Sequence, residues 1–346
     1  MEQASKHILV MRLSAMGDVA MTVPVIKAMV RTYPNVKITV VSRAFFKPIF
    51  QDISNVSFYA ADVKGRHKGV RGLYKLYKEL KTLDIDLIAD LHNVLRSNIL
   101  CTYFKLGGYK ICKIDKGRAA KKALTQTKDK VFQQLKTTHK RYADVFSQLG
   151  HHIDVSKEDV LPQLKIAQKV ALFIGKTKKK LIGIAPFAAF DGKTYPVSQM
   201  EAVISKLSET EQYKVVLFGG PADKKQLVAW ETKYKNVVNG AGLFSFEEEL
   251  NLISNLDVML SMDSGNAHLA AMFGRKVVTI WGITHPYAGF YPFGQPKENA
   301  LLADRAQYPL LPTSIYGNKY PAGYENIMQT ITPEAVFEKI VEVVKD

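Results

Sequence analysis

An acidic residue stands in a short glycine-containing loop near the start of the chain. The loop, RLSAMGDV (12–19), follows an apolar run and opens a helical pattern that continues to about Tyr33. Gly17 permits a tight backbone turn, and Asp18 in such a loop can accept a proton from an incoming hydroxyl group. Ser14 or Asp18 could instead cap the following helix. The spacing matches neither GxGxxG nor a P-loop, so it does not predict dinucleotide or P-loop phosphate binding.

A lysine occupies a second loop, PFAAFDGKTYP (186–196), between a predicted strand and a helix that begins around Ser198. A lysine in a glycine-containing loop at the mouth of a sheet can neutralise a phosphate, so Lys193 is a candidate ligand for one. The alternative is an ordinary surface lysine.

A third segment, MDSGNAHLAA (262–271), joins a buried strand to a helix. The backbone N–H groups of Ser264, Gly265 and Asn266 would lie at the start of that helix, where phosphate binds well. Asp263 could bind sugar hydroxyls or cap the helix. His268, one turn further on, is equally well explained as a packed residue or as a ligand.

A pair of glycines, Gly219 and Gly220, follows another predicted strand in the segment FGGPAD (218–223). Glycines allow a nucleotide to approach the backbone closely, although a plain turn accounts for them equally well. The histidines and the two cysteines have no metal-site spacing, so no metal is predicted.

Short Val/Ile/Leu-rich runs alternate with helical patterns in both halves of the chain. This alternation predicts parallel strands covered by helices, in two Rossmann-like doubly wound domains. Ligands of such sheets bind beyond the carboxyl ends of the strands. The predicted strands are 7–13, 36–41, 57–60, 86–91, 109–114, 181–185, 214–219, 236–238, 258–262 and 276–281.

The domain boundary is expected near Pro162 and the polar segment that ends in KTKKK. We therefore predict an N-terminal domain at 1–165 and a C-terminal domain at 166–330. The last segment, 331–346, predicts an amphipathic helix with Thr332 as its N-cap, which could pack back onto the N-terminal domain.

Positive charge is concentrated in the first half of the chain. The net charge is +16; residues 1–160 hold 28 Lys and Arg against 14 acidic residues, a net +14, and the remainder is +2. The densest stretch, 105–141, has twelve cations and two aspartates. Such a half suits an anionic partner: nucleic acid, a membrane surface or an acidic substrate. The alternative is a lysine-rich face that only aids solubility.

The composition, 47% hydrophobic and 23% charged, is that of a globular protein and excludes general disorder. No apolar run approaches the ~20 residues of a membrane span, and the N-terminus lacks the apolar region of a signal peptide. We therefore expect a cytoplasmic protein.

The four segments together resemble glycosyltransferase family 9, the ADP-heptose:lipopolysaccharide heptosyltransferases, over essentially the whole chain. The family patterns R-x-S-x-x-G-D-V with T-x-P, lysine-x-aromatic-Pro, D-[ST]-G-x-x-H-L-A-A and G-x-T-x-P occur in order. The matching residues are Arg12, Ser14, Gly17, Asp18, Val19, Thr22, Pro24, Lys193, Tyr195, Pro196, Asp263, Ser264, Gly265, His268, Leu269, Ala270, Ala271, Gly282, Thr284 and Pro286.

The resemblance implies a GT-B fold, with two Rossmann-like doubly wound domains facing a central cleft. It implies an inverting single displacement in which Asp18 is the general base, Lys193 binds the diphosphate and Asp263 contacts the sugar. Further donor-binding residues would be Ser264, Gly265, Asn266, His268, Gly219 and Gly220. The acceptor would meet Arg12, Ser14, Gly17, Lys121 and Lys122.

The substrates implied by the resemblance are ADP-heptose as donor and the lipopolysaccharide core, or a lipid A precursor, as acceptor. The enzyme would then work at the cytoplasmic face of the inner membrane, bound peripherally to its anionic surface. We expect no obligatory cofactor and no nucleic-acid partner.

Three alternatives remain. One is a family 9 enzyme with another nucleotide-sugar donor, because Ala188 and Ala189 replace hydroxyl residues that touch the phosphates in well-known members. Another is a non-catalytic protein that binds anionic surfaces or nucleic acid, although 105–141 lacks the interleaved aromatics of an RNA-binding signature. The third is a sugar-nucleotide epimerase, which would lack the acceptor-facing basic domain.

Overall fold

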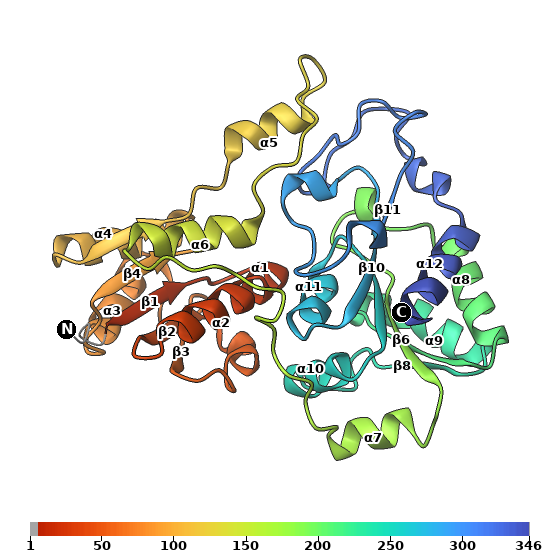
Figure 1. The fold of residues 1–346 in the computed structure, drawn as a ribbon, viewed down its shortest axis with the longest axis horizontal. Helices are drawn as coiled ribbons and strands as arrows, with labels where there is room; N and C mark the ends of the chain where they lie inside the picture. Colours follow the sequence, from red (N-terminus) through yellow and green to blue (C-terminus); the bar gives the residue numbers. More distant parts are fainter. Residues whose placement is uncertain (1–5, 346) are drawn as a thin grey trace. The chain divides into compact units, whose positions relative to one another are not determined.

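The computed structural model describes residues 6–345, which divide into two compact units (Figure 1). Within the described chain, the first unit contains residues 6–116 and 138–161. The second contains residues 117–137 and 162–345. Each unit has its own sheet, and we describe each unit by itself.

The first unit is built on a five-stranded parallel sheet with the order β3-β2-β1-β4-β5. Its central strand β1 is buried along nearly all of its length, and Val10 pairs with Val40 on one side and with Ala89 on the other. The strands are β1 (His7–Met11), β2 (Lys37–Ser42), β3 (Val56–Ala60), β4 (Leu87–Asp90) and β5 (Lys110–Lys113).

Helices cover both faces of this sheet. Leu9 and Met11 of β1 join a buried cluster with apolar residues of α3 and α4. Alternate residues of a strand point to opposite faces, so Ile8 and Val10 face the other layer, where α2 and α6 pack together. The helices are α1 (Met16–Ala20), α2 (Thr22–Thr32), α3 (Gly69–Lys81), α4 (Leu95–Leu106) and α6 (Thr138–Gln148), with a 3₁₀ turn at Ala44–Ile49.

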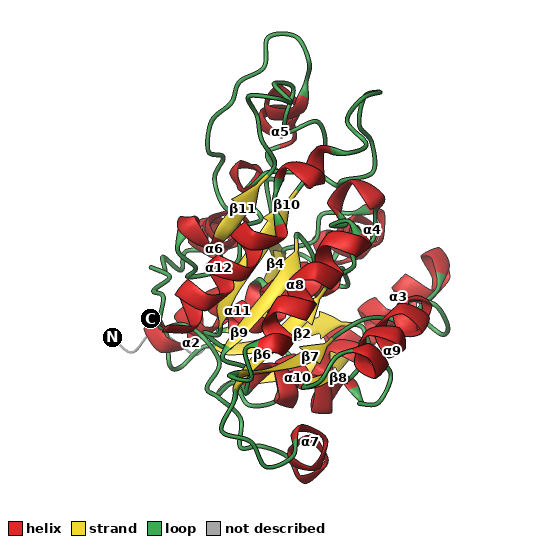
Figure 2. Cartoon of the chain, turned by 90° about the vertical axis from the view of Figure 1, so that its right-hand side faces the viewer, coloured by secondary structure: helices red, strands yellow, loops and turns green. Residues whose placement is uncertain are grey.

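The second unit has a six-stranded parallel sheet with the order β11-β10-β9-β6-β7-β8. Counted within the unit, this is the 3-2-1-4-5-6 order of a doubly wound dinucleotide-binding fold. Figure 2 shows the strands between layers of helices. The strands are β6 (Lys180–Ala185), β7 (Tyr213–Leu217), β8 (Val237–Asn239), β9 (Val258–Met262), β10 (Lys276–Trp281) and β11 (Ala300–Leu302).

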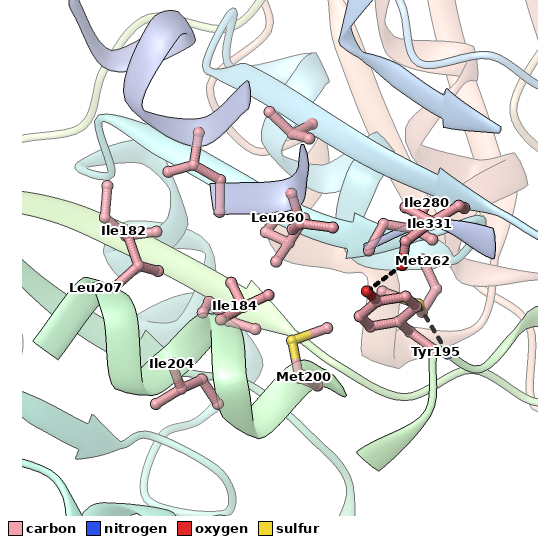
Figure 3. Close-up of a cluster of buried hydrophobic side chains, with 14 of the residues drawn as sticks. Ile182, Ile184, Tyr195, Met200, Ile204, Leu207, Leu260, Met262, Ile280 and Ile331 are labelled. Atoms are coloured by element: carbon pink, nitrogen blue, oxygen red, sulfur yellow. Dashed lines mark hydrogen bonds between the residues drawn. The ribbon is translucent and has the colours of Figure 1, made fainter. Parts of the chain in front are cut away.

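The core of the second unit locks the lysine loop onto the sheet. Tyr195 is almost fully buried; its backbone N–H lies 3.4 Å from the sulfur of Met262, and its hydroxyl donates to the carbonyl of Ile331 at 2.6 Å (Figure 3). The helices are α7 (Gln168–Ile174), α8 (Val197–Glu209), α9 (Lys224–Lys233), α10 (Phe246–Ser254), α11 (Gly265–Met272) and α12 (Pro333–Lys345), with 3₁₀ turns at Asp191–Lys193, Pro221–Asp223, Pro286–Ala288, Lys297–Asn299 and Ile327–Thr330.

The C-terminal helix α12 belongs to the second unit. The Thr332 hydroxyl accepts a hydrogen bond from the backbone N–H of Ala335 at 3.2 Å, as expected of an N-cap. Val336, Ile340 and Val343 are buried in the core of this unit, and the helix packs against α8. The apolar stripe of the helix is thus buried within the second unit, and the return of 331–346 to the N-terminal domain stays a prediction.

Residues 117–137, which include α5 (Arg118–Thr125), form an excursion that also groups with the second unit. The sequence predicts them to lie in the N-terminal domain at 1–165. The physical reason for the difference is apolar packing: Leu124 and Leu135 form a buried cluster with Ala288. The Arg305 guanidinium lies 3.4 Å from the ring centroid of Phe132.

A lysine of the excursion, Lys130, connects it to the rest of the second unit. The Nζ atom of Lys130 donates to the carbonyl oxygens of Leu124 and Pro312, each at 2.8 Å. Burial, with a smaller contribution from Arg305, lowers the pKa of this lysine to about 8. Within the part of the chain that the structure describes, no helix has the length and apolarity needed to cross a bilayer.

Candidate functional site

The first group of site residues lies at the carboxyl ends of β1 and β4. Strand order reverses between these two strands, and ligands of doubly wound sheets bind at such a switch point. Arg12, directly after β1, donates from Nη1 to the carbonyl oxygen of Leu91 after β4, at 2.7 Å. Its Nη2 forms an ion pair with Oδ2 of Asp18. A nearly buried guanidinium thus connects the two loops of the switch point.

Asp18 lies in the first turn of α1 and keeps its side chain 28% exposed. Its Oδ2 atom accepts from the backbone N–H of Ala15 at 3.4 Å, and its backbone carbonyl accepts from the hydroxyl of Tyr142 at 3.3 Å. The capping role allowed by the sequence is therefore present, and it coexists with an accessible carboxylate. Ser14 and Gly17 lie half-buried in the same turn.

Burial alone would lower the pKa of Arg12, but the neighbouring Tyr142 and Asp18 outweigh it, so the pKa is raised. The charge of Arg12 is thus secure, and the guanidinium holds the Asp18 carboxylate in one place. A fixed, partly exposed carboxylate is the arrangement that general-base catalysis requires.

Two residues beside Arg12 were missed by sequence reasoning. Asp90, fully buried at the end of β4, accepts from the backbone N–H groups of His92 and Asn93 at 2.9 Å and from the hydroxyl of Ser97 at 2.9 Å. His92 is buried too, and its Nδ1 accepts from the backbone N–H of Leu13 at 3.4 Å. The available signal was the position of DLH after a strand that neighbours β1.

Burial, followed by the positive charges of Arg12 and Lys116, lowers the pKa of His92 to about 3. The imidazole is therefore neutral at neutral pH. Because Nδ1 accepts a hydrogen bond, the proton resides on Nε2, which is left as a neutral donor.

The second group of site residues lies at the equivalent switch point of the second unit, between β6 and β9. Lys193 comes from the loop after β6, and Asp263 follows β9. The Nζ atom of Lys193 lies 2.8 Å from Oδ2 of Asp263; the two side chains are 16% and 8% exposed. Residues that are 70 positions apart in the sequence thus form one charge pair at the sheet edge.

Glycines make room for the Lys193 side chain. Gly317 has φ +81°, and a Cβ atom there would lie 2.2 Å from Cγ of Lys193. A Cβ atom on Gly282 would lie 2.7 Å from the carbonyl oxygen of Gly192, which accepts from the backbone N–H of Ile283 at 3.2 Å. The lysine therefore runs through a narrow passage that sets where its ammonium group points.

The start of α11 adjoins this pair. Ser264 is the N-cap residue, and its hydroxyl lies 2.9 Å from that of Ser261. The first backbone N–H groups of a helix have no partner within the helix, so Gly265 and Asn266 present donors where an anion could bind. His268, one turn in, is buried.

The two glycines predicted near the donor also lie at this edge, after β7. The backbone N–H of Gly220 donates to Oδ2 of Asp223 at 2.8 Å, and a Cβ atom on Gly219 would lie 2.7 Å from Leu227. A turn therefore explains both glycines, as the sequence alternative allowed, while their position remains beside the Lys193 loop on an adjacent strand.

The structure does not bring Lys121 and Lys122 together with Arg12, Ser14 and Gly17 in one unit. Both lysines lie on α5 in the excursion that packs on the second unit. The Nζ atom of Lys121 is 4.1 Å from the ring centroid of Phe290. Their expected role in acceptor binding remains a prediction.

The two groups of residues have complementary chemistry. One offers a fixed carboxylate beside a neutral imidazole, suited to taking a proton. The other offers an ammonium group and helix-start amides, suited to holding an anion. Within residues 6–345, no cluster of three or more His, Cys, Asp and Glu side chains could hold a metal ion.

Solved structures share this fold. The chain is similar to a family 9 glycosyltransferase from Veillonella parvula (TM-score 0.77, 20% identity, 100% of this chain and 99% of that chain). It is also similar to Escherichia coli ADP-heptose lps heptosyltransferase II (0.66, 19%, 98% of each chain) and to E. coli heptosyltransferase WaaC with ADP (0.67, 18%, 97% and 99%). Two Rossmann-like domains of this kind make up the GT-B fold.

The sequence places the chain more narrowly. It matches the model of glycosyltransferase family 9 (heptosyltransferase) over residues 73–312, more than half of its length, and it belongs to that family. Two relatives from Haemophilus influenzae are a lipopolysaccharide core heptosyltransferase OpsX (25% identical over 292 residues, 82% of this chain and 81% of the relative) and a lipooligosaccharide heptosyltransferase 2 (26% over 361 residues, 97% and 99%). The predicted family and fold are thereby confirmed, and the protein is a glycosyltransferase.

Proposed function

We propose that this glycosyltransferase moves heptose from ADP-heptose to the inner core of lipopolysaccharide, with inversion at the anomeric carbon. The observation that carries the proposal is the Lys193–Asp263 pair beside the start of α11. The pair combines an ammonium group that can bind a diphosphate with a carboxylate that can bind sugar hydroxyls. The names of the relatives support the sugar and the acceptor: one is a lipopolysaccharide core heptosyltransferase and the other a lipooligosaccharide heptosyltransferase.

The proposed reaction is a single displacement. The acceptor oxygen forms a bond to the anomeric carbon while the bond from that carbon to the β-phosphate oxygen breaks. The proton of the acceptor hydroxyl passes to Asp18, and the electron pair of the broken bond leaves on ADP. Lys193 and the amides of Gly265 and Asn266 stabilise the negative charge that grows on the diphosphate. Asp263 contacts the sugar.

Asp18 needs no unusual basicity for this role. A carboxylate with a reference pKa of about 3.9 is a weak base, but it suffices when proton transfer is late and the attacking hydroxyl has become acidic. Arg12 keeps the carboxylate in position, and the Nε2 proton of neutral His92 offers a donor nearby.

The proposed acceptor also implies where in the cell the enzyme acts. The inner core is attached to lipid A and is rich in phosphate and carboxylate groups, which suits the +14 charge of residues 1–160. We therefore propose that the enzyme acts at the cytoplasmic face of the inner membrane as a peripheral protein. No obligatory cofactor enters the proposed reaction.

The donor base is the part of the proposal to test first, because Ala188 and Ala189 leave the loop before Lys193 without hydroxyl groups. A ligand that binds only the folded protein stabilises it by about 2.7 kcal/mol at a hundredfold excess over its dissociation constant. In a thermal-shift panel of ADP, UDP, GDP and CMP, we expect ADP to give the largest shift. A larger shift with another nucleotide would contradict ADP-heptose as the donor and would indicate a sugar linked to that nucleotide instead.

The sugar, the acceptor and the stereochemistry need a direct assay. Incubation with ADP-heptose and Kdo-lipid A, or a heptosylated core, should yield a product one heptose heavier by mass spectrometry. The anomeric configuration of the new linkage, read by NMR, should be opposite to that of the donor. Retention of the anomeric configuration would contradict the single displacement. Transfer from another nucleotide sugar, but not from ADP-heptose, would contradict the proposed donor.

A further inference from the structure

The helices α3 and α4 form the outer layer on one face of the first sheet and pack against each other (Figures 1 and 2). Their buried side consists of leucines, Cys101 and Phe104. The segment that leads into α3 and includes it is strongly basic: residues 64–81 contain seven Lys and Arg and one acidic residue, Glu79. Glu79 is already paired with Arg66 and His67.

Three tyrosines tie the two helices together at this outer side. The ring centroids of Tyr74 and Tyr103 are 5.3 Å apart, those of Tyr77 and Tyr103 are 5.8 Å apart, and those of Tyr74 and Tyr77 are 6.0 Å apart. The Tyr103 hydroxyl donates to the backbone carbonyl of Val70 at 3.3 Å. The cluster is continuous from the start of α3 to the last turns of α4.

Large apolar side chains flank these tyrosines in solvent. Leu106 is 82% exposed, Val70 is 60% exposed and Tyr74 is 45% exposed. Leu106 belongs to the same end of α4 as Gly107, where a Cβ atom would lie 2.8 Å from the hydroxyl of Tyr77. A single exposed leucine needs no explanation, but an exposed leucine and valine around an aromatic cluster form a patch.

Cations surround the same patch. At 100° per residue, Arg71, Lys78 and Lys81 all lie within about 60° of Tyr74 on the surface of α3. All three are exposed. Lys78 lies 5.5 Å from the ring centroid of Tyr74, and Arg71 and Lys81 pair with no acidic side chain of the described chain. We call the set Val70, Arg71, Tyr74, Lys78, Lys81 and Leu106 the tyrosine–lysine face.

We propose that the tyrosine–lysine face binds the surface of an anionic phospholipid bilayer. Tyrosine rings prefer the interface between headgroups and acyl chains, exposed aliphatic side chains enter the acyl region, and cations attract anionic headgroups. Charge complementarity selects this partner over an apolar protein surface. The inference rests on the proposed membrane-anchored acceptor and names the surface that meets the membrane.

The structure favours this face over the basic excursion. Residues 105–141 are the densest basic stretch of the sequence, but part of that stretch packs on the second unit. There Lys121 lies over Phe290, and Lys130 is held by two carbonyl groups. On α3, by contrast, the cations stand around exposed apolar side chains.

Flotation with phosphatidylcholine vesicles, with and without phosphatidylglycerol, tests the proposal without any donor or turnover. We expect binding only to the anionic vesicles, falling as salt rises because exposed charges are screened over about 8 Å at physiological salt. The variant Arg71→Glu/Lys78→Glu should bind these vesicles at least roughly 30-fold more weakly, since each cation near such a surface contributes on the order of 1 kcal/mol. Leu106→Ser should weaken binding about 10-fold through lost apolar burial.

Matched controls lie in the second unit. Lys176→Glu/Lys178→Glu makes the same charge change at exposed positions, and Leu172→Ser alters a leucine that is 76% exposed. Both should bind the anionic vesicles like the wild type. Equal losses in the two charge-reversal variants would show that net charge alone drives binding, and equal losses in the two Leu→Ser variants would show that the place of the leucine does not matter; either result would overturn the proposal.

Failure of the wild type to float with anionic vesicles at low salt would also overturn the proposal. So would a concentration-dependent dimer, seen by analytical ultracentrifugation, that Leu106→Ser dissolves without any change in flotation. Circular dichroism and the ADP thermal shift show whether each variant is folded. The proposed donor can fail in the ADP measurement while vesicle binding persists, so the two proposals are separable.

Discussion

The ammonium group of Lys193 lies 2.8 Å from the carboxylate of Asp263, and both side chains are largely shielded from solvent. This charge pair occupies the switch point of the second sheet, where a ligand of a doubly wound fold binds. A diphosphate that binds here would meet a lysine whose position is already fixed. Preorganised charge of this kind stabilises a transition state better than a flexible surface lysine does.

Lys193→Ala should therefore weaken nucleoside diphosphate binding and slow the chemical step by about 10²–10³-fold, because charge on the leaving group is left unstabilised. Isothermal titration with ADP and single-turnover kinetics measure the two effects. The matched control is Lys180→Ala, which removes an exposed lysine 3.0 Å from Asp257 on the same unit and should change neither. ADP affinity and turnover both unchanged in Lys193→Ala would exclude the proposed role.

Gly317→Ala should disturb the same site without touching a charge. The added Cβ atom would lie 2.2 Å from Cγ and 2.3 Å from Cδ of Lys193, so the lysine must move, and we expect about 10-fold weaker ADP binding. Positive φ also costs about 1–2 kcal/mol for alanine. Gly323→Ala separates the two effects, because its φ is +84° and its Cβ would meet nothing within 4 Å. Equal ADP affinities in the two variants would contradict the steric argument.

Asp18→Asn keeps the size and shape of the side chain but removes the proton acceptor. We expect turnover to fall by roughly 10²–10⁴-fold, with ADP binding unchanged because that site belongs to the second unit. Asp52→Asn, at an exposed position of the first unit, is the control and should keep full turnover. Near-normal turnover of Asp18→Asn in a saturating assay would exclude Asp18 as the base.

Much of the fold could be predicted from the sequence because buried parallel strands have a clear signature. The runs HILVM, VMLSM and KVVTIW are continuous apolar segments, and each is a strand in the structure. The short edge strand β11 (Ala300–Leu302) was missed. It is only three residues long and partly exposed, so it has no continuous apolar run that would indicate a buried strand.

The excursion at 117–137 could not be assigned from the sequence for a different reason. Charge density marks 105–141 as one basic stretch, whereas grouping depends on Leu124, Phe132 and Leu135, three apolar residues with no regular period. Long-range packing against Ala288 and Tyr287 decides the outcome. Composition carries no information about that contact.

The candidate site likewise has residues that the sequence predicts and residues that only the folded chain reveals. Motif spacing singled out Asp18, Lys193 and Asp263, and in the structure the last two form an ion pair at 2.8 Å. The DLH segment follows a predicted strand, but the contacts of His92 and Asp90 with the end of β1 arise only when β4 pairs with β1. Strand order, rather than local sequence, makes them part of the site.

His92 gives a prediction about pH. Its pKa is about 3 in the folded protein, whereas an unfolded histidine titrates near 6.5. Below pH about 6.5 the unfolded chain therefore binds a proton that the folded chain excludes. The free energy of unfolding should fall by about 1.4 kcal/mol per pH unit on this account as pH drops toward about 3, and the contribution is fully retained above about 6.5.

His92→Gln should remove this slope, so its unfolding free energy should fall less steeply than that of the wild type between pH about 6 and about 4. Urea unfolding followed by circular dichroism reports on both units, whereas tryptophan fluorescence reports on the second alone, because Trp230 and Trp281 both lie there. The variant should thus alter the pH dependence of the first signal and spare the second. His152→Gln, at an exposed position, should match the wild type in both. Identical slopes for His92→Gln and the wild type would mean that His92 does not hold its neutral form in the fold.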